Sequence, residues 1–389
     1  MPAITQAFLE RGLFWNSLSI KSCFFAGILL KTSFLREIPA LLQARTGIRK
    51  RVRRIAVSVK HTVPKALTIA GSDSGGGAGI QADLKTFQEL GAYGMTAITA
   101  VTAQNTLGVQ GVYPMSAEAI ERQLVSIGED LPPDALKTGM LFSGEIVRVV
   151  AAAIRRFGWA HVVVDPVMIA KGGAALLQQE AVDALIDALL PLASVVTPNI
   201  PEAEALSGIR IVDQATREEA AKRIYSYGCK HVIIKGGHEA NAESSTDLLF
   251  DGQTFTSFMA PRLETRHTHG TGCTFAAAVT AGLAQGMAMP DAIRQAKMFI
   301  HAAIASPLEI GAGHGPTNHW AYRRLAVGDG VLGVRGSAAN DAQAAAGISG
   351  VEAVEIAAAG ERVSGLGESA SGPDVDAAST SAGMRGARK

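Results

Sequence analysis

A chain of 389 residues has room for two or three domains, and its 48% hydrophobic content is enough for a large core. A formal net charge of +1 argues against a general nucleic-acid-binding protein, and no apolar run is long enough to cross a bilayer. The three cysteines, Cys23, Cys229 and Cys273, lie far apart without a cysteine–histidine cluster. This excludes a disulfide framework and a structural zinc site, and it predicts a reducing, cytoplasmic location.

The first 62 residues differ in character from the rest of the chain. Residues 1–65 contain 12 lysines and arginines but only two acids, and they include the run RKRVRR at Arg49–Arg54. Three interpretations stay open: an upstream extension that need not be native, a lineage-specific appendage, or a transit peptide. We expect RKRVRR to be a solvated charge run rather than a nucleic-acid contact, and we set residues 1–62 apart as a weakly ordered basic extension.

From about Val63 onward, short apolar strands alternate with helices. Strands are predicted at 66–71, 160–166, 194–199 and 230–237, and helices at 143–158, 180–192 and 216–228. Ser143 is the expected N-cap of the first of these helices, with Gly158 beyond its end, and Thr216 with Glu219 forms a predicted capping box. Strands that are apolar throughout indicate a parallel sheet covered by helices on both faces, which is an α/β fold.

The polar motifs of this region follow the predicted strands. They are GSDSGGG, TAQN, DPVM, TPN and KGGH, and parallel sheets bind ligands at the carboxyl ends of their strands. We therefore expect one domain over residues 63–325 with a single site at that edge. Residues 326–389 are rich in Gly, Ala and Ser and contain no aromatic residue, so they are predicted to form a disordered tail.

The stretch HGTGCT precedes the apolar helical run FAAAVTAGLAQG. The first N–H groups of a helix lack intrahelical partners, and the helix dipole favours negative charge there. Gly270 and Gly272 would let the backbone approach an anion closely. The alternative is a tight loop in which glycine only relieves backbone strain.

A second glycine-rich stretch, GSDSGGGAGIQADLKTF, also lies between a strand and a helix. It matches neither the P-loop nor the GxGxxG pattern, and its glycines could equally form a hinge. Asp83, in the following helix, is expected either to face the same pocket or to compensate the helix dipole. Asp165 and Glu202 are ordinary acids individually, but together beside an anion site they could hold Mg²⁺ through water.

Together these segments resemble the ribokinase-like family, and within it the hydroxymethylpyrimidine/phosphomethylpyrimidine kinases of thiamine biosynthesis. The resemblance covers about Lys65 to Tyr322, roughly two-thirds of the chain, and its most specific motifs are AGIQADLKTF, TAQNT and HGTGCT. It implies a three-layer α/β/α domain, a homodimer, the use of ATP and Mg²⁺, and two successive phosphorylations of 4-amino-5-hydroxymethyl-2-methylpyrimidine. A pyridoxal kinase, and a non-catalytic protein that binds a pyrimidine or nucleotide, are the alternatives; nucleic-acid and membrane partners are not expected.

The resemblance also implies roles for individual residues. Gln104 would hydrogen-bond the pyrimidine, which suits an amide because it offers a donor and an acceptor side by side. The remaining substrate pocket would contain Asp83, Gly71, Ala78, Met140 and Val167. ATP would be contacted by Lys235, Lys297, Asn199 and Glu202, and the metal by Glu202 and, through water, Asp165. Gly270, Thr271, Gly272 and Cys273 would hold the migrating phosphoryl group.

Two positions need separate comment. Cys273 stands where ribokinase-like enzymes commonly have an aspartate base, and a helix start is expected to lower the thiol pKa. It would then accept a proton in the first transfer and serve as a pocket wall in the second; a small buried hydrophobic residue is the alternative.

Where the family typically reads GxDPSGGAGI, this chain has GSDSGGGAGI, and the missing proline is expected to loosen the turn at Asp73 and Ser74.

Overall fold

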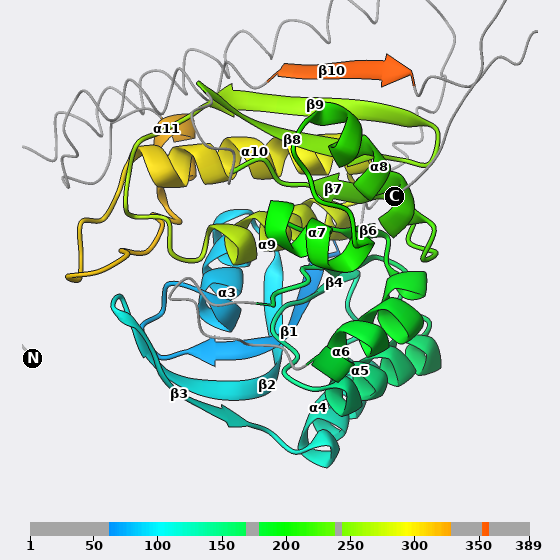
Figure 1. Ribbon diagram of the computed structural model, residues 1–389. Coiled ribbons are helices and arrows are strands. Elements are labelled where there is room, and N and C mark those ends of the chain that lie inside the picture. Colours follow the sequence, from blue (N-terminus) through cyan, green and yellow to red (C-terminus); the bar gives the residue numbers. More distant parts are fainter. Residues whose placement is uncertain (1–61, 169–178, 238–242, 328–351, 358–389) are drawn as a thin grey trace, which may run out of the picture. The chain divides into compact units, whose positions relative to one another are not determined.

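The computed structural model describes residues 62–168, 179–237, 243–327 and 352–357 (Figure 1). Except for Thr62, the predicted basic extension at residues 1–62 lies outside the described residues. Of the predicted tail at 326–389, only residues 326–327, at the end of a helix, and 352–357, a strand, are described. All of the described residues belong to one compact unit, Thr62–Lys389.

The described residues form one ten-stranded sheet with the order β10-β9-β8-β7-β6-β5-β4-β1-β2-β3. The strands are β1 (Lys65–Asp73), β2 (Tyr93–Asn105), β3 (Gly108–Pro114), β4 (Ala135–Thr138), β5 (Val162–Val164), β6 (Val195–Val196), β7 (Val232–Ile234), β8 (Ser244–Phe250), β9 (Thr254–Pro261) and β10 (Glu352–Ala357). The centre, from β2 through β1 to β7, is parallel, whereas β3 and β8–β10 pair antiparallel at the two ends.

Helices cover both faces of the parallel part, which confirms the predicted three-layer α/β/α fold (Figure 1). One layer contains α4 (Ala117–Asp130), α5 (Gly144–Phe157), α6 (Gln179–Ala184), α7 (Ile200–Ser207) and α8 (Gln214–Tyr225), and the other contains α3 (Gly79–Glu89), α9 (Thr271–Ala284), α10 (Met289–Ala305) and α11 (Ala321–Val327). Successive strand residues alternate between the two cores: Val162 and Val164 pack with the first, and Val163 with the second. Both faces of each central strand are therefore buried, which explains their continuous apolar sequences.

The ends of two helices test the predicted caps. α5 begins after Ser143, whose hydroxyl accepts from Ile146 N, and ends at Gly158 in the left-handed conformation (φ 65°), as predicted. The predicted box at Thr216 and Glu219 is wrong. α8 starts earlier, with Asp213 as its N-cap and Thr216 as the third helical residue that closes the box.

Two further observations complete the fold. The predicted helix at 180–192 is divided into α6, a π-helical turn at Leu185–Leu189 and a 3₁₀ turn at Leu190–Leu192 that contains Pro191. Among the described helices, none has the length and apolar character needed to span a membrane.

Candidate active site

A cavity of about 820 Å³ opens at the carboxyl ends of the central strands, as the polar motifs predicted. It brings together nearly all of the predicted site residues, from segments that are far apart in sequence. Those that line it are Gly71, Ala78, Gln104, Met140, Asp165, Val167, Asn199, Glu202, Lys235, Gly270, Thr271, Gly272, Cys273 and Lys297.

The HGTGCT loop forms one wall of the cavity and leads directly into α9. Gly270 is the N-cap, with a φ of 83°, and no side chain caps the helix. A Cβ at this position would overlap the carbonyl oxygen of Gly77, so the two glycine-rich loops touch through their main chains. Both the left-handed φ and this contact require glycine. The first turn of α9 therefore lines the cavity without a side-chain cap, although Thr271 N donates to Thr268 O at 3.4 Å.

A lysine lies beside this turn. Nζ of Lys235 donates to Oδ1 of Asp165 at 3.0 Å, and a Cβ on Gly272 would stand 3.5 Å from the same Nζ. Burial alone would lower the pKa of Lys235, but the charges of Asp165 and Glu202 outweigh burial and raise it. The lysine is therefore charged, and it adds positive charge to the helix start.

Glu202 and Asn199 form the N-terminal capping box of α7. The Asn199 side-chain oxygen accepts from Glu202 N, and Oε2 of Glu202 accepts from Asn199 N, both at 2.9 Å. Burial raises the pKa of Glu202 to about 7 in spite of the nearby Lys235 charge. The NxxE spacing thus has a structural role in addition to its predicted contact with ATP.

At another part of the cavity, Lys297 is held by a strand that sequence reasoning did not single out. Its Nζ donates to Oδ2 of Asp247 at 2.8 Å and to Oγ of Ser245 at 3.2 Å, and Oδ1 of Asp247 accepts from Gly236 N. The sequence did contain a signal for this contact, because Asp247 directly precedes the apolar residues LLF of the same strand. A buried carboxylate in a strand needs a partner.

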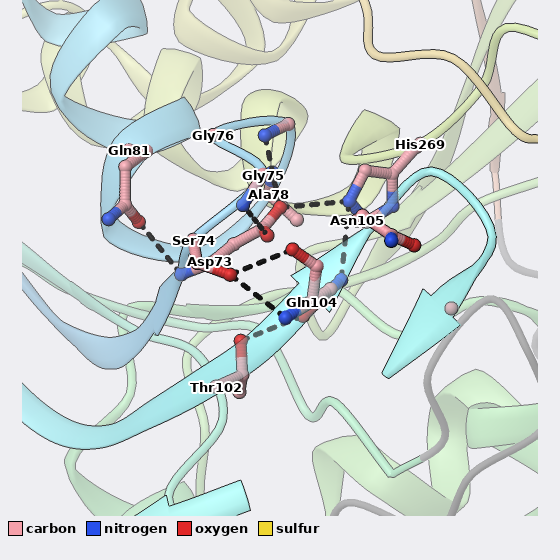
Figure 2. Close-up of polar contacts among 12 residues, drawn as sticks. Asp73, Ser74, Gly75, Gly76, Ala78, Gln81, Thr102, Gln104, Asn105 and His269 are labelled. Atoms are coloured by element: carbon pink, nitrogen blue, oxygen red, sulfur yellow. Dashed lines mark hydrogen bonds and ion pairs between the residues drawn. The ribbon is translucent and has the colours of Figure 1, made fainter. Parts of the chain in front are cut away.

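The GSDSGGG loop forms the wall around Gln104 (Figure 2). The Asp73 carboxylate accepts from Gly75 N at 2.8 Å, Gly77 N at 3.0 Å and Ala78 N at 2.8 Å, and the Ser74 hydroxyl bonds the main chain of Gln104. Side-chain hydrogen bonds therefore brace this turn without the proline, and the expected loosening relative to a proline-containing turn stays a prediction.

Asp83 does not line the cavity. It is completely buried, with both carboxylate oxygens 3.1 Å from Nζ of Lys137 and with a hydrogen bond of 2.6 Å from Thr68 Oγ1. The expected position facing the pocket is therefore wrong, and so is simple dipole compensation on an exposed helix turn. The ion pair with Lys137 explains why a carboxylate can be buried at this position.

The comparisons with known proteins agree with this geometry. A family model described as phosphomethylpyrimidine kinase matches residues 73–318. A hydroxymethylpyrimidine/phosphomethylpyrimidine kinase of Bacillus subtilis is 54% identical over 263 residues, covering 68% of this chain and 97% of the relative. The enzyme of that name from Haemophilus influenzae is 57% identical over 267 residues, covering 68% and 99%. The chain belongs to the phosphomethylpyrimidine kinase family.

A solved structure extends the comparison to a related activity. The pyridoxal kinase of Staphylococcus aureus, in complex with AMP-PCP and pyridoxal, is similar with a TM-score of 0.64 and 37% identity, over 76% of this chain and 100% of that one. The family and its relatives identify this protein as an ATP-dependent kinase.

The thiol of this phosphomethylpyrimidine kinase family member departs from expectation. Burial raises the pKa of Cys273 to about 11, and the nearby Asp83 and Asp165 charges act in the same direction against Lys137. The predicted lowering by the helix start is therefore wrong for the ligand-free protein. Desolvation outweighs the effect of the helix start on the thiol pKa.

Sequence reasoning missed a third residue besides Asp247 and Lys137. His269 precedes the anion loop, is 8% exposed, and places Nε2 at 2.9 Å from Oδ2 of Asp73. Its position directly before Gly270 was a signal in the sequence for a site residue, because Gly270 is where the two glycine-rich loops touch. A Cβ at Gly77 would overlap this ring, so that glycine makes room for it.

Proposed function

We propose that the protein transfers the γ-phosphoryl group of ATP to the hydroxymethyl oxygen of 4-amino-5-hydroxymethyl-2-methylpyrimidine, and a second phosphoryl group to the resulting monophosphate. The observation that carries the proposal is a single cavity with an uncapped helix start and a charged lysine in one wall and Gln104 in another. The two similar enzymes from Bacillus subtilis and Haemophilus influenzae, both named hydroxymethylpyrimidine/phosphomethylpyrimidine kinase, supply the substrate class.

The chain's own residues act mainly by position and charge. Phosphoryl transfer passes through a loose transition state, so catalysis depends on holding the group and neutralising its charge. The N–H groups at the start of α9 and the Lys235 ammonium would supply both, because they lie together in one wall of the cavity. In the first transfer, the acceptor oxygen forms its bond to the γ-phosphorus while the bond from that phosphorus to the β-phosphate oxygen breaks and leaves ADP, and the hydroxyl proton passes to water.

Mg²⁺ fits this site only together with ATP. Asp165 and Glu202 give two cavity-lining carboxylates, and within the described ranges no cluster of three or more His, Cys, Asp or Glu side chains could hold a metal. This agrees with Mg²⁺ bound by one or two carboxylates, water and phosphate oxygens rather than by a protein cage. When bound, the ion would neutralise charge on the phosphates.

The decisive experiment identifies the products by mass after incubation with the pyrimidine and excess ATP. We expect the monophosphate first and the diphosphate later, with ADP released in both steps. Phosphorylation of pyridoxal with no pyrimidine product would contradict the proposal and support the alternative kinase.

The role of Cys273 can be measured separately in the two transfers. Since its thiol is protonated at neutral pH, we expect Cys273→Ala to reduce both transfers by a similar factor, as a pocket wall would. A loss confined to the first transfer would instead support a base role, because only the hydroxyl has a proton to give up.

A homodimer and a cytoplasmic location stay predictions. Light scattering of the purified protein measures the first, and fractionation of cells that express the untagged chain measures the second.

A further inference from the structure

The side chain of Gln104 lies between two polar groups whose donor and acceptor roles can be deduced (Figure 2). On one side is Nε2 of His269, and on the other is the hydroxyl of Thr102. A carboxamide can be placed in two orientations that fill the same volume and differ by half a turn. The partners decide which orientation is correct.

The first partner is fixed by Asp73. Its carboxylate accepts three main-chain N–H groups, and the bonds from His269, Ala78 and Gly75 lower its pKa against the effect of burial. An ionised carboxylate only accepts hydrogen bonds. Since Nε2 of His269 lies 2.9 Å from Oδ2, this nitrogen must carry a hydrogen and point it at Asp73.

The second partner is fixed by Ser72. The Thr102 hydroxyl lies 2.9 Å from the carbonyl oxygen of Ser72, which can only accept, so the single hydroxyl hydrogen points there. The Thr102 oxygen is then left as an acceptor toward Gln104, 3.0 Å away.

With Nε2 of Gln104 toward His269, as drawn in Figure 2, an amide donor faces at 3.3 Å a protonated ring nitrogen, which has no lone pair to accept from it. The Gln104 oxygen then also faces the Thr102 hydroxyl, whose single hydrogen already points at Ser72 O. Turned by half a turn, the carboxamide places its nitrogen toward the Thr102 oxygen, which can accept, and its oxygen beside the protonated Nε2 of His269. The Nε2 hydrogen stays directed at Asp73, and Gln104 is at most its second acceptor. No donor is then directed at an atom that cannot accept, which is the favoured state of a partly buried polar group.

The main chain of Gln104 is also held, so only the side-chain orientation is left to set. The Ser74 hydroxyl accepts from Gln104 N at 2.8 Å and donates to Gln104 O at 2.7 Å. The β2–β3 register shifts between Ala103 and Gln104, a bulge of the kind that redirects a side chain.

We infer that Asp73, acting through His269, is a positioning residue that fixes the Gln104 carboxamide with its oxygen on the His269 side, and that this orientation selects how the substrate ring lies. The inference rests on the proposed function, because it concerns the aminopyrimidine. The remaining lone pair of the oxygen would accept from the exocyclic amino group, and the remaining N–H would donate to the adjacent ring nitrogen.

This orientation directs the reacting group correctly. In the substrate, the carbon that bears the hydroxymethyl group is next to the carbon that bears the amino group. Because His269 directly precedes Gly270, an amino group on the His269 side brings the hydroxymethyl group toward the anion loop. The opposite carboxamide orientation would favour a ring turned over, with its hydroxyl directed away from that loop.

The first test needs no substrate. Nitrogen-15 spectra of the full-length protein with labelled histidine, assigned with His269→Gln, should show a hydrogen on Nε2 of His269. In Asp73→Asn the preference for this tautomer should be lost. An Nε2 without a hydrogen in the wild type would overturn the inference.

The second test separates orientation from loop stability. Asp73→Asn should raise KM for the pyrimidine about tenfold or more, because a donor in the pocket is left mismatched, while KM for ATP changes less than about twofold. The matched control is Lys85→Met, which removes a bond of 2.6 Å from the same loop, to Gly76 O, and leaves the Asp73–His269 pair intact. We expect its KM values to stay within about twofold of the wild type.

Equal increases in KM for the two variants would overturn the inference, because general loosening of the loop would then account for them. If Asp73→Asn does not fold, the tautomer of the wild type still decides. A wild-type enzyme that phosphorylates no pyrimidine would refute the proposed function instead, while the protonation of His269 could still be read.

Discussion

Two glycine-rich loops precede helices on the same side of the sheet, yet they do different work. The loop before α3 contains its own anion: the Asp73 carboxylate takes the N–H groups of Gly75, Gly77 and Ala78. The loop before α9 contains none, and its helix begins without a side-chain cap next to Lys235. Glycine content alone therefore does not identify a phosphate site. The deciding feature is whether a nearby carboxylate already occupies the N–H groups.

The difference assigns a separate task to each loop. In the proposed reaction, the loop at Asp73 would support Gln104, whose main chain Ser74 bonds, and the loop before α9 would receive the negative charge of a ligand. Each task can be disturbed by substitutions that leave the other loop's hydrogen bonds in place.

The contact between the loops is the most sensitive point. Gly270→Ala puts a Cβ into the carbonyl of Gly77 at a φ of 83°, so we expect kcat/KM to fall about 1,000-fold and the melting temperature to drop. The control is Gly286→Ala, which has a similar φ of 81° but no atom within 4 Å, and it should cost only about 1–2 kcal/mol of stability. Equal effects would show that backbone strain, not the loop contact, is responsible.

The charge beside the open loop is the next target. Lys235→Met removes the ammonium between Asp165 and Glu202, and we expect kcat to fall about 100-fold with a raised KM for ATP. KM for the pyrimidine should change little, because Gln104 is unaffected. Steady-state kinetics with each substrate varied in turn measure this, and a selective effect on the pyrimidine KM would contradict the division of tasks.

The buried acid of the same wall should give a pH-dependent stability. Burial raises the pKa of Glu202 to about 7 from 4.5, so the unfolded state releases its proton first as the pH rises. Between pH 4.5 and 7, the free energy of unfolding of the wild type should thus fall by on the order of 3 kcal/mol relative to that of Glu202→Gln. Thermal unfolding at both pH values tests this, with the exposed Glu219→Gln as control; parallel curves for wild type and Glu202→Gln would refute it.

The thiol at the loop crossing should react slowly. With its pKa raised to about 11, Cys273 in the ligand-free protein should be alkylated at pH 8 about 100-fold more slowly than an unperturbed thiol. Peptide mass mapping distinguishes it from the buried Cys229, whose pKa burial raises to about 12. Rapid alkylation of Cys273 would restore the thiolate interpretation.

Local sequence rules predicted the elements well, and long-range partners caused the errors. The caps of α5 follow from Ser143 and Gly158 alone, whereas at α8 the predicted cap at Thr216 was wrong because Asp213, three residues earlier, caps the helix. The ion pair of Asp83 joins residues 54 apart in the chain, and the raised pKa of Cys273 comes from burial and from the charges of Asp83 and Asp165, which are distant in the sequence. Neither leaves a periodic pattern that could be read beforehand.

The main-chain contact between Gly77 and Gly270 has a consequence for the two acceptors of the proposed reaction. This contact sets the separation between the cavity wall at Gln104 and the cavity wall at the start of α9. Because it is made by peptide groups, which have no rotamers, the separation cannot change through a side-chain rotation. The monophosphate is longer than the alcohol by one phosphoryl group, so the two molecules cannot place their reacting oxygens identically while both rings rest on Gln104. The alcohol and the monophosphate should therefore bind at positions that overlap but are displaced from one another, so that only one of them is bound at a time. Excess alcohol should then delay the appearance of the diphosphate.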